Sequence, residues 1–104
     1  MGSLEDDVLA ALQPRGLRER ARLALSDGYT AAQVVARLPQ GRQEALGAGV
    51  ANPEVAWRRA VDAVAETLRA LSASGAVRRA RAALKVDLRS KGARNIEVDV
   101  YRLA

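Results

Sequence analysis

The chain has 104 residues and a formal net charge of +5, which is enough length for one domain with a modest core. It contains no cysteine and no histidine, so disulfides, thiolate metal sites and the commonest metal ligand are excluded. No run of about 18 apolar residues is present to span a bilayer, and the acidic start lacks the basic-then-apolar layout of a signal peptide.

A short helix is predicted within residues 1–13. Ser3 and the three carboxylates that follow it suit the first turn of a helix, where a capping hydroxyl and negative charge are both stabilising. Its apolar stripe consists of Leu4, Val8 and Leu12, with Leu9 beside it. Because so short a helix is not stable alone, it packs either on its own domain or on a second copy of the chain, and the sequence leaves both open.

Two more helices are predicted on either side of an Asp-Gly-Tyr turn. The first covers 16–26, and its apolar face consists of Leu17, Ala21, Ala24 and Leu25. The second begins at a capping box, in which Thr30 and Gln33 satisfy each other's backbone donors, and Pro39 ends it. Its apolar positions are Ala31, Val34, Val35 and Leu38.

A glycine-rich connection at 40–51, with at most one helical turn near 43–46, leads to the longest predicted helix. Asn52 as N-cap and Pro53 at the first position mark its start, and it extends to about Ser74. Its apolar stripe consists of Trp57, Val61, Val64, Leu68 and Leu71. We interpret Trp57 as a core residue rather than a base-contacting one, because large aromatic side chains on such a stripe are usually buried.

The opposite face of this helix is charged. Arg58 and Asp62 have the spacing of an ion pair, and so do Glu66 and Arg69. Since two carboxylates lie among these arginines, we expect only the first turns, with Arg58 and Arg59, to contact a polyanion.

After Gly75, which suits a left-handed helix end, Val77 is expected to point back into the core and the pattern becomes alternating. Two strands of a hairpin are predicted, one with Leu84, Val86 and Leu88 on one face and one with Ile96, Val98 and Val100 on one face and Glu97, Asp99 and Tyr101 on the other. The turn at 89–95 carries Arg89, Lys91 and Arg94. From Arg69 to Arg94 eight bases oppose one acid, which indicates either a polyanion-binding surface or a solvated cationic face that deters edge pairing.

Two segments resemble the winged helix-turn-helix superfamily. Residues 67–79, TLRALSASGAVRR, resemble the end of a recognition helix and the start of a wing. Residues 27–38, DGYTAAQVVARL, resemble the first turn and second helix of such regulators. The resemblance implies an α+β winged-helix fold in a single domain, 1–104, with an accessory helix at 1–13, a three-helix core at 16–74 and a hairpin wing at 75–104. The connection at 40–51 departs from the family pattern, whose turn is usually about three or four residues long.

The resemblance implies a cytoplasmic double-stranded DNA-binding protein, of the kind that regulates transcription, acting as a monomer or a homodimer. The long helix would enter the major groove and the wing would contact the backbone or the minor groove. The predicted DNA-binding residues are Arg58, Arg59, Arg79, Arg81, Arg89, Lys91 and Arg94. We expect no enzymatic activity, cofactor, metal, membrane or small-molecule ligand, because no nucleophile elbow or ligand cluster is present.

Two alternatives stay open. One is a winged-helix domain that binds another protein through its acidic first helix or the 40–51 connection. The other is RNA binding, which is less favoured because only Tyr29, Trp57 and Tyr101 are aromatic and they form no evident stacking platform.

Overall fold

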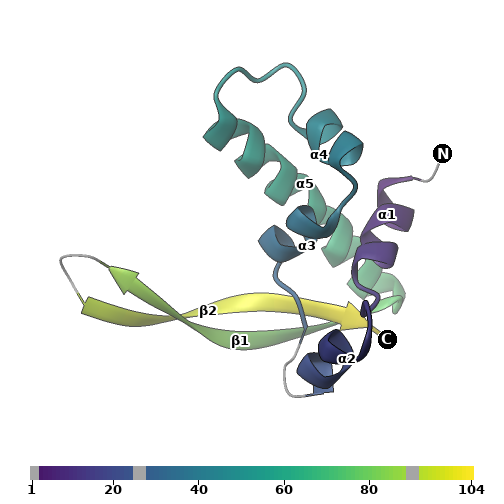
Figure 1. Cartoon of the computed structure of the whole chain (residues 1–104), viewed down its shortest axis with the longest axis vertical. Helices are drawn as coiled ribbons and strands as arrows, with labels where there is room; N and C mark the ends of the chain where they lie inside the picture. Colours follow the sequence, from purple (N-terminus) through teal and green to yellow (C-terminus); the bar gives the residue numbers. More distant parts are fainter. Residues whose placement is uncertain (1–2, 25–27, 89–91) are drawn as a thin grey trace.

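The computed structural model describes residues 3–24, 28–88 and 92–104, and in them helices precede a long antiparallel hairpin (Figure 1). The predicted α+β class is therefore confirmed. The helices are α1 (Leu4–Ala11), α2 (Leu17–Ala24), α3 (Ala31–Arg37), α4 (Gln40–Leu46) and α5 (Pro53–Ser74), and the strands are β1 (Val77–Leu88) and β2 (Gly92–Leu103). The molecule measures 43 × 35 × 27 Å, and the hairpin projects away from the helices.

The three predicted helix starts are confirmed. The Ser3 hydroxyl accepts from the Asp6 amide and the Asp6 carboxylate accepts from the Ser3 amide, which forms a capping box. Thr30 and Gln33 form the second box in the same way. Asn52 caps α5, its side-chain oxygen accepting from the amides of Glu54 and Val55.

The core lies where α1, α3 and the second half of α5 meet above the base of the hairpin. Its most deeply buried side chains are those of Val8, Leu12, Val34, Val35, Val64 and Leu68. Because Val8 and Leu12 are covered within the chain itself, α1 is a packing helix of this body.

The predicted face of α2 is wrong. Leu17 is 83% exposed and Ala21 is exposed, whereas Leu23 is buried. The helix is anchored by Leu23 and by Glu19, four residues before it, so the side chain that turns inward in its first turn is a carboxylate rather than an apolar group. The expected roles of Ala24 and Leu25 lie outside what the structure describes.

The connection at 40–51 holds a full helix, α4, rather than a single turn. Gly47 ends α4, and a Cβ there would lie 2.9 Å from the Cβ of Ala56 on α5. The glycine therefore allows α4 to rest closely on the first turns of α5.

The prediction that Trp57 belongs to the core is also wrong. On α5 the stripe is buried at Ala60, Val64, Leu68 and Leu71, but Trp57 is 44% exposed. Helix α4 rests on these first turns at Ala56, but it leaves a hollow beside Trp57, so the indole stays partly open to solvent. Neither predicted ion pair on the other face of α5 occurs among the described residues, where these four side chains are exposed to water.

Gly75 adopts the expected left-handed conformation, with φ at 86°, and leads directly into β1. Val77 is buried, as predicted. β2 is longer than expected, because it already begins at Gly92, which pairs with Leu88, so Arg94 lies in a strand and not in the turn. The expected side-chain faces of Leu84, Val86 and Leu88 lie outside the described part of the structure.

The base of the hairpin is covered on both faces. Val100 is buried on one face and Tyr101, expected on the polar side, is only 3% exposed on the other. Tyr101 pairs with Tyr29 through two backbone hydrogen bonds of 2.8 Å, which adds a one-residue third strand to the ribbon. This bridge fixes the segment between α2 and α3 against the hairpin.

Candidate nucleic-acid interface

The hairpin carries the whole net charge of the protein. Residues 1–76 contain nine bases and nine acids, whereas 77–104 contain eight bases and three acids, and this difference equals the net charge of +5. Because the hairpin projects from the helices (Figure 1), its charge is presented on an extended ribbon rather than in a pocket. Such a shape and sign suit a polyanion.

The predicted hairpin residues are not equivalent. Arg79 on β1 is exposed and lies opposite Tyr101, and Arg94 on β2 is exposed near the distal end of the ribbon. Arg81 faces two carboxylates on β2, with its guanidinium 3.4 Å from Asp99 and 3.7 Å from Glu97.

Arg79 and Arg94 therefore present more positive charge to a ligand than Arg81 does. Arg89 and Lys91 lie outside the described residues.

Arg58 and Arg59 are exposed on the first turns of α5 and form no ion pair among the described residues. They point in different directions, because consecutive helical residues are about 100° apart. Over its length α5 has three bases and three acids, so it supplies local contacts rather than a strong field.

Two adjoining hollows connect α5 with the hairpin. The first lies beside Trp57 and Arg58, and the second lies between Arg69 and Asp99; both are lined by Ala32 and Val61. Together they form a shallow groove whose lining is mostly apolar, with Arg58 and Arg69 from α5 and two acids, Glu54 and Asp99, as its charged members. The groove brings α5 and β2 to one side of the molecule. Trp57 is the groove residue that the sequence interpretation missed. Its position on the apolar stripe of α5 was correct, but the prediction that other elements bury it was wrong.

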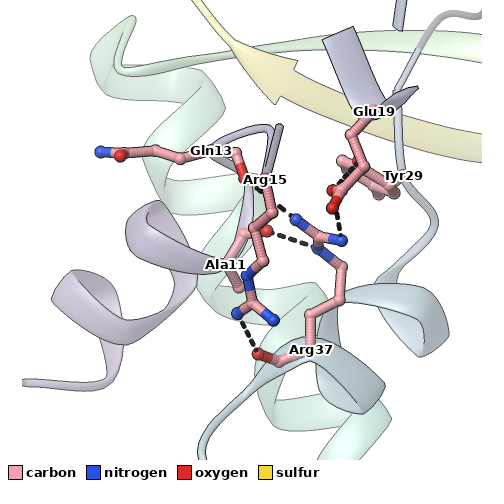
Figure 2. A network of polar contacts seen from close by, with 6 residues as sticks. All are labelled: Ala11, Gln13, Arg15, Glu19, Tyr29 and Arg37. Carbon is pink, nitrogen blue, oxygen red and sulfur yellow. Dashed lines mark hydrogen bonds and ion pairs between the residues drawn. The ribbon is translucent and has the colours of Figure 1, made fainter. Parts of the chain in front are cut away.

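A polar network ties α2 to the carboxyl-terminal ends of α1 and α3 (Figure 2). The Arg37 guanidinium contacts the Glu19 carboxylate at 2.6 Å and donates to the carbonyl oxygens of Ala11 and Gln13 at 2.6 and 2.9 Å. Its carbon lies 4.5 Å from the centre of the Tyr29 ring, and the Tyr29 hydroxyl donates to Glu19 at 3.0 Å.

The network also shifts the pKa values of Glu19 and Tyr29. Burial raises the pKa of Glu19, but the hydrogen bonds from Tyr29 and Arg37 outweigh it, so the pKa lies below its ordinary value. Burial and the hydrogen bond to Glu19 raise the pKa of Tyr29. Burial, with the charge of Asp99, raises the pKa of Tyr101. Glu19 and Tyr29 hold α2 and α3 together, whereas Tyr101 lines the hollow between Arg69 and Asp99.

Other kinds of site find little support in the part of the chain described. In residues 3–24, 28–88 and 92–104 no cluster of three or more acidic, histidine or cysteine side chains is arranged to hold a metal ion. None of the described helices is both long and apolar enough to cross a membrane. In comparisons with protein-family models, curated proteins and solved structures, no match to the chain is found.

Proposed function

We propose that the protein binds double-stranded DNA, as a regulator of transcription does, through its basic hairpin and the first turns of α5. The observation that carries the proposal is the concentration of the whole net charge on the projecting hairpin. Neutralising phosphates releases counterions, so a ribbon of arginines gains affinity from any duplex.

The order of elements supports a winged-helix form of this interaction. The Tyr29 bridge, α3 and α5 precede the hairpin, and Gly75 turns the chain from α5 straight into β1. In this arrangement α5 is the recognition helix and the hairpin is the wing. The additional helix α4 stands where the superfamily has a short turn, and it rests against the first turns of α5 at Ala56.

The two parts have different tasks in the proposal. Arg58 and Arg59 meet base edges in the major groove, where a bidentate arginine–guanine contact contributes about 1 to 3 kcal/mol of discrimination. Arg79 and Arg94 contact phosphates and supply affinity that depends on salt but little on sequence.

The experiment is a salt titration of the binding of a labelled random-sequence duplex, comparing the full chain with Arg79→Gln/Arg94→Gln. We expect the slope of log affinity against log salt to become shallower by about 2 in the double variant, because each lost phosphate contact removes about one unit. Arg81→Gln is the matched control, and it should change the slope less because Asp99 and Glu97 already compensate its charge. An unchanged slope in the double variant would exclude the hairpin as the contact.

The exposure of Trp57 favours a second candidate, a domain that binds another protein. An indole that is 44% exposed beside an apolar groove is the kind of feature on which protein interfaces centre. Recovery of a stoichiometric protein partner after nuclease treatment, lost in Trp57→Ala and kept in Arg79→Gln/Arg94→Gln, would establish this function in place of DNA binding.

A further inference from the structure

The amino-terminal half of the chain has a formal net charge of zero, but its positive and negative side chains lie on different surfaces. Residues 15–24, which include all of α2, carry four arginines, Arg15, Arg18, Arg20 and Arg22, and one acid, Glu19. Arg18, Arg20 and Arg22 are exposed, whereas the Glu19 carboxylate is turned inward to Arg37 and Tyr29. The described outer surface of α2 is therefore cationic without an acid of its own.

The acids that balance these arginines in the sequence lie elsewhere. Asp6 is held in the capping box of Ser3, and Asp7 pairs with Arg42 at 2.7 Å. Both belong to α1, whose amino-terminal turn lies well away from α2 (Figure 1). Asp27 follows α2 in the sequence but lies outside the described residues.

The cationic surface continues onto the base of the hairpin. Arg20 and Arg102 line one hollow together with Leu23 and Leu103, and none of the residues that line it is acidic. Arg102 donates to the carbonyl oxygen of Leu23 at 3.2 Å, which fixes β2 against α2. Arg78 is the strand partner of Arg102, so a further exposed arginine lies beside the same region.

Helix α2 lies far from the amino-terminal end of α5 (Figure 1). In Figure 1 the amino-terminal end of α5 and helix α2 lie toward opposite ends of the longest dimension, which is 43 Å, and the hairpin runs between them. A major groove is only about 12 Å wide, so the groove that receives α5 does not also reach α2.

We propose that the exposed surface of α2, with Arg18 and Arg22 on one side of the helix and Arg20 on the other, is a second site for duplex phosphates, so that one chain holds two DNA segments. The inference rests on the proposed function, because it takes double-stranded DNA, the partner proposed for the hairpin and α5, as the partner of α2 as well. Mutual repulsion of the α2 arginines disfavours the surface without a ligand, and bound phosphates relieve this repulsion. An anionic membrane is the weaker partner, because Leu17 is the one large apolar side chain exposed among the described residues of α2, and it buries too little apolar surface for stable anchoring.

The experiment measures bridging. A duplex fixed on beads is incubated with the protein and a second, fluorescent duplex of the same sequence, and the captured fluorescence is compared with the binding of a single duplex in solution. We expect the wild type to capture the second duplex and Arg18→Gln/Arg20→Gln/Arg22→Gln to capture about tenfold less or lower, since three phosphate contacts are lost. Single-duplex affinity should stay within about threefold at 0.15 M salt, because charges more than about 8 Å from the bound phosphates are largely screened.

The control variant is Arg79→Gln/Arg94→Gln, which should lose single-duplex affinity and capture together. Circular dichroism checks the fold of each variant, and the exposure of the three α2 arginines predicts an unchanged spectrum. Capture by the triple variant at the wild-type level would overturn the second site and indicate a dimer with one site per chain.

Three other results also overturn it. The first is a wild type that binds one duplex but captures no second one. The second is a triple variant that loses single-duplex affinity and capture in equal proportion, which would indicate one continuous site. The third is a triple variant that bridges normally but no longer binds vesicles of phosphatidylserine and phosphatidylcholine. A wild type that binds no duplex at all would instead refute the proposed function.

Discussion

The guanidinium of Arg37 reaches three elements at once. From the end of α3 it contacts Glu19 on α2, the carbonyl oxygens of Ala11 and Gln13 at the end of α1, and the ring of Tyr29 (Figure 2). Its planar fork matches these directions, which an ammonium group on a lysine does not. Arg37 therefore organises the amino-terminal helices although no hydrophobic pattern points to it.

Replacing Arg37 by alanine should lower the free energy of unfolding by about 2 to 3 kcal/mol, because the carbonyl oxygens and Glu19 lose a charged donor. Urea unfolding measures the change, and Arg37→Lys should recover only part of the loss. Arg59→Ala is the matched control, since that arginine is exposed, and it should stay within about 0.5 kcal/mol of wild type. Equal effects at both positions would contradict a structural role for the network.

The same network predicts how stability depends on pH. The pKa of Glu19 in the folded protein lies below its ordinary value of 4.5, despite the opposing effect of burial. The ionised carboxylate thus stabilises the fold above the unfolded pKa, and this contribution is lost as the pH falls through the folded value.

Glu19→Gln should therefore lose stability near neutral pH and show a weaker further loss on acidification than wild type. Unfolding midpoints measured from about pH 7 down to about pH 3 test this, a range that brackets ordinary carboxyl pKa values. Parallel curves for the two proteins would show that Glu19 does not contribute.

Backbone geometry predicts a graded series at three glycines. A Cβ on Gly28, whose φ is 130°, would lie 2.2 Å from the carbonyl oxygen of Tyr101, so alanine there should cost about 3 kcal/mol or more. Alanine at Gly75, with φ at 86° and open space around it, should cost about 1 to 2 kcal/mol. Gly41 lies inside α4 with nothing within 4 Å, and alanine there should stabilise by about 0.4 to 1 kcal/mol. Urea midpoints that do not follow this order would contradict the Tyr29–Tyr101 bridge or the Gly75 turn.

At the scale of elements, local signals are the ones that the sequence predicts well. The caps at Ser3, Thr30 and Asn52 and the helix end at Gly75 involve residues within a few positions of one another, so the sequence contains both partners. α4 has no side-chain cap, since Pro39 precedes it, and Gly41 within it disfavours a helix. It forms because it packs on α5, and that contact is not visible in the local pattern.

Burial was less predictable than helix position. Periodicity places Trp57 on the correct stripe of α5, but it does not say where the covering elements end. On α2 the pattern favours Leu17 over Leu23, because it ignores a carboxylate that is buried by pairing with Arg37. In both cases the missing information is a contact between segments distant in the sequence.

At the scale of the whole molecule, core and charge are separated. The helical part is neutral and holds most of the buried side chains, whereas the hairpin carries the net charge. The candidate residues on the hairpin were visible as a run of bases, but the compensation of Arg81 depends on strand register. The cationic face of α2 was hidden, because counting charges along the chain treats Glu19 as if it lay on the same surface as its neighbouring arginines.

This separation predicts different pH responses for stability and for DNA binding. The chain has no histidine, and its bases are arginines and a few lysines, so the chain has no side chain of the type that usually changes charge near neutral pH. Affinity for a random duplex at fixed ionic strength should change by less than about twofold between about pH 6 and pH 8.5, since no side chain has an unperturbed pKa there. Over the same range, raising the salt from about 50 to 200 mM should weaken binding by orders of magnitude if six or more phosphates are contacted. If the affinity for the duplex falls when the pH is changed near neutrality, a group other than arginine controls the interface. That result would contradict the proposed role of the hairpin.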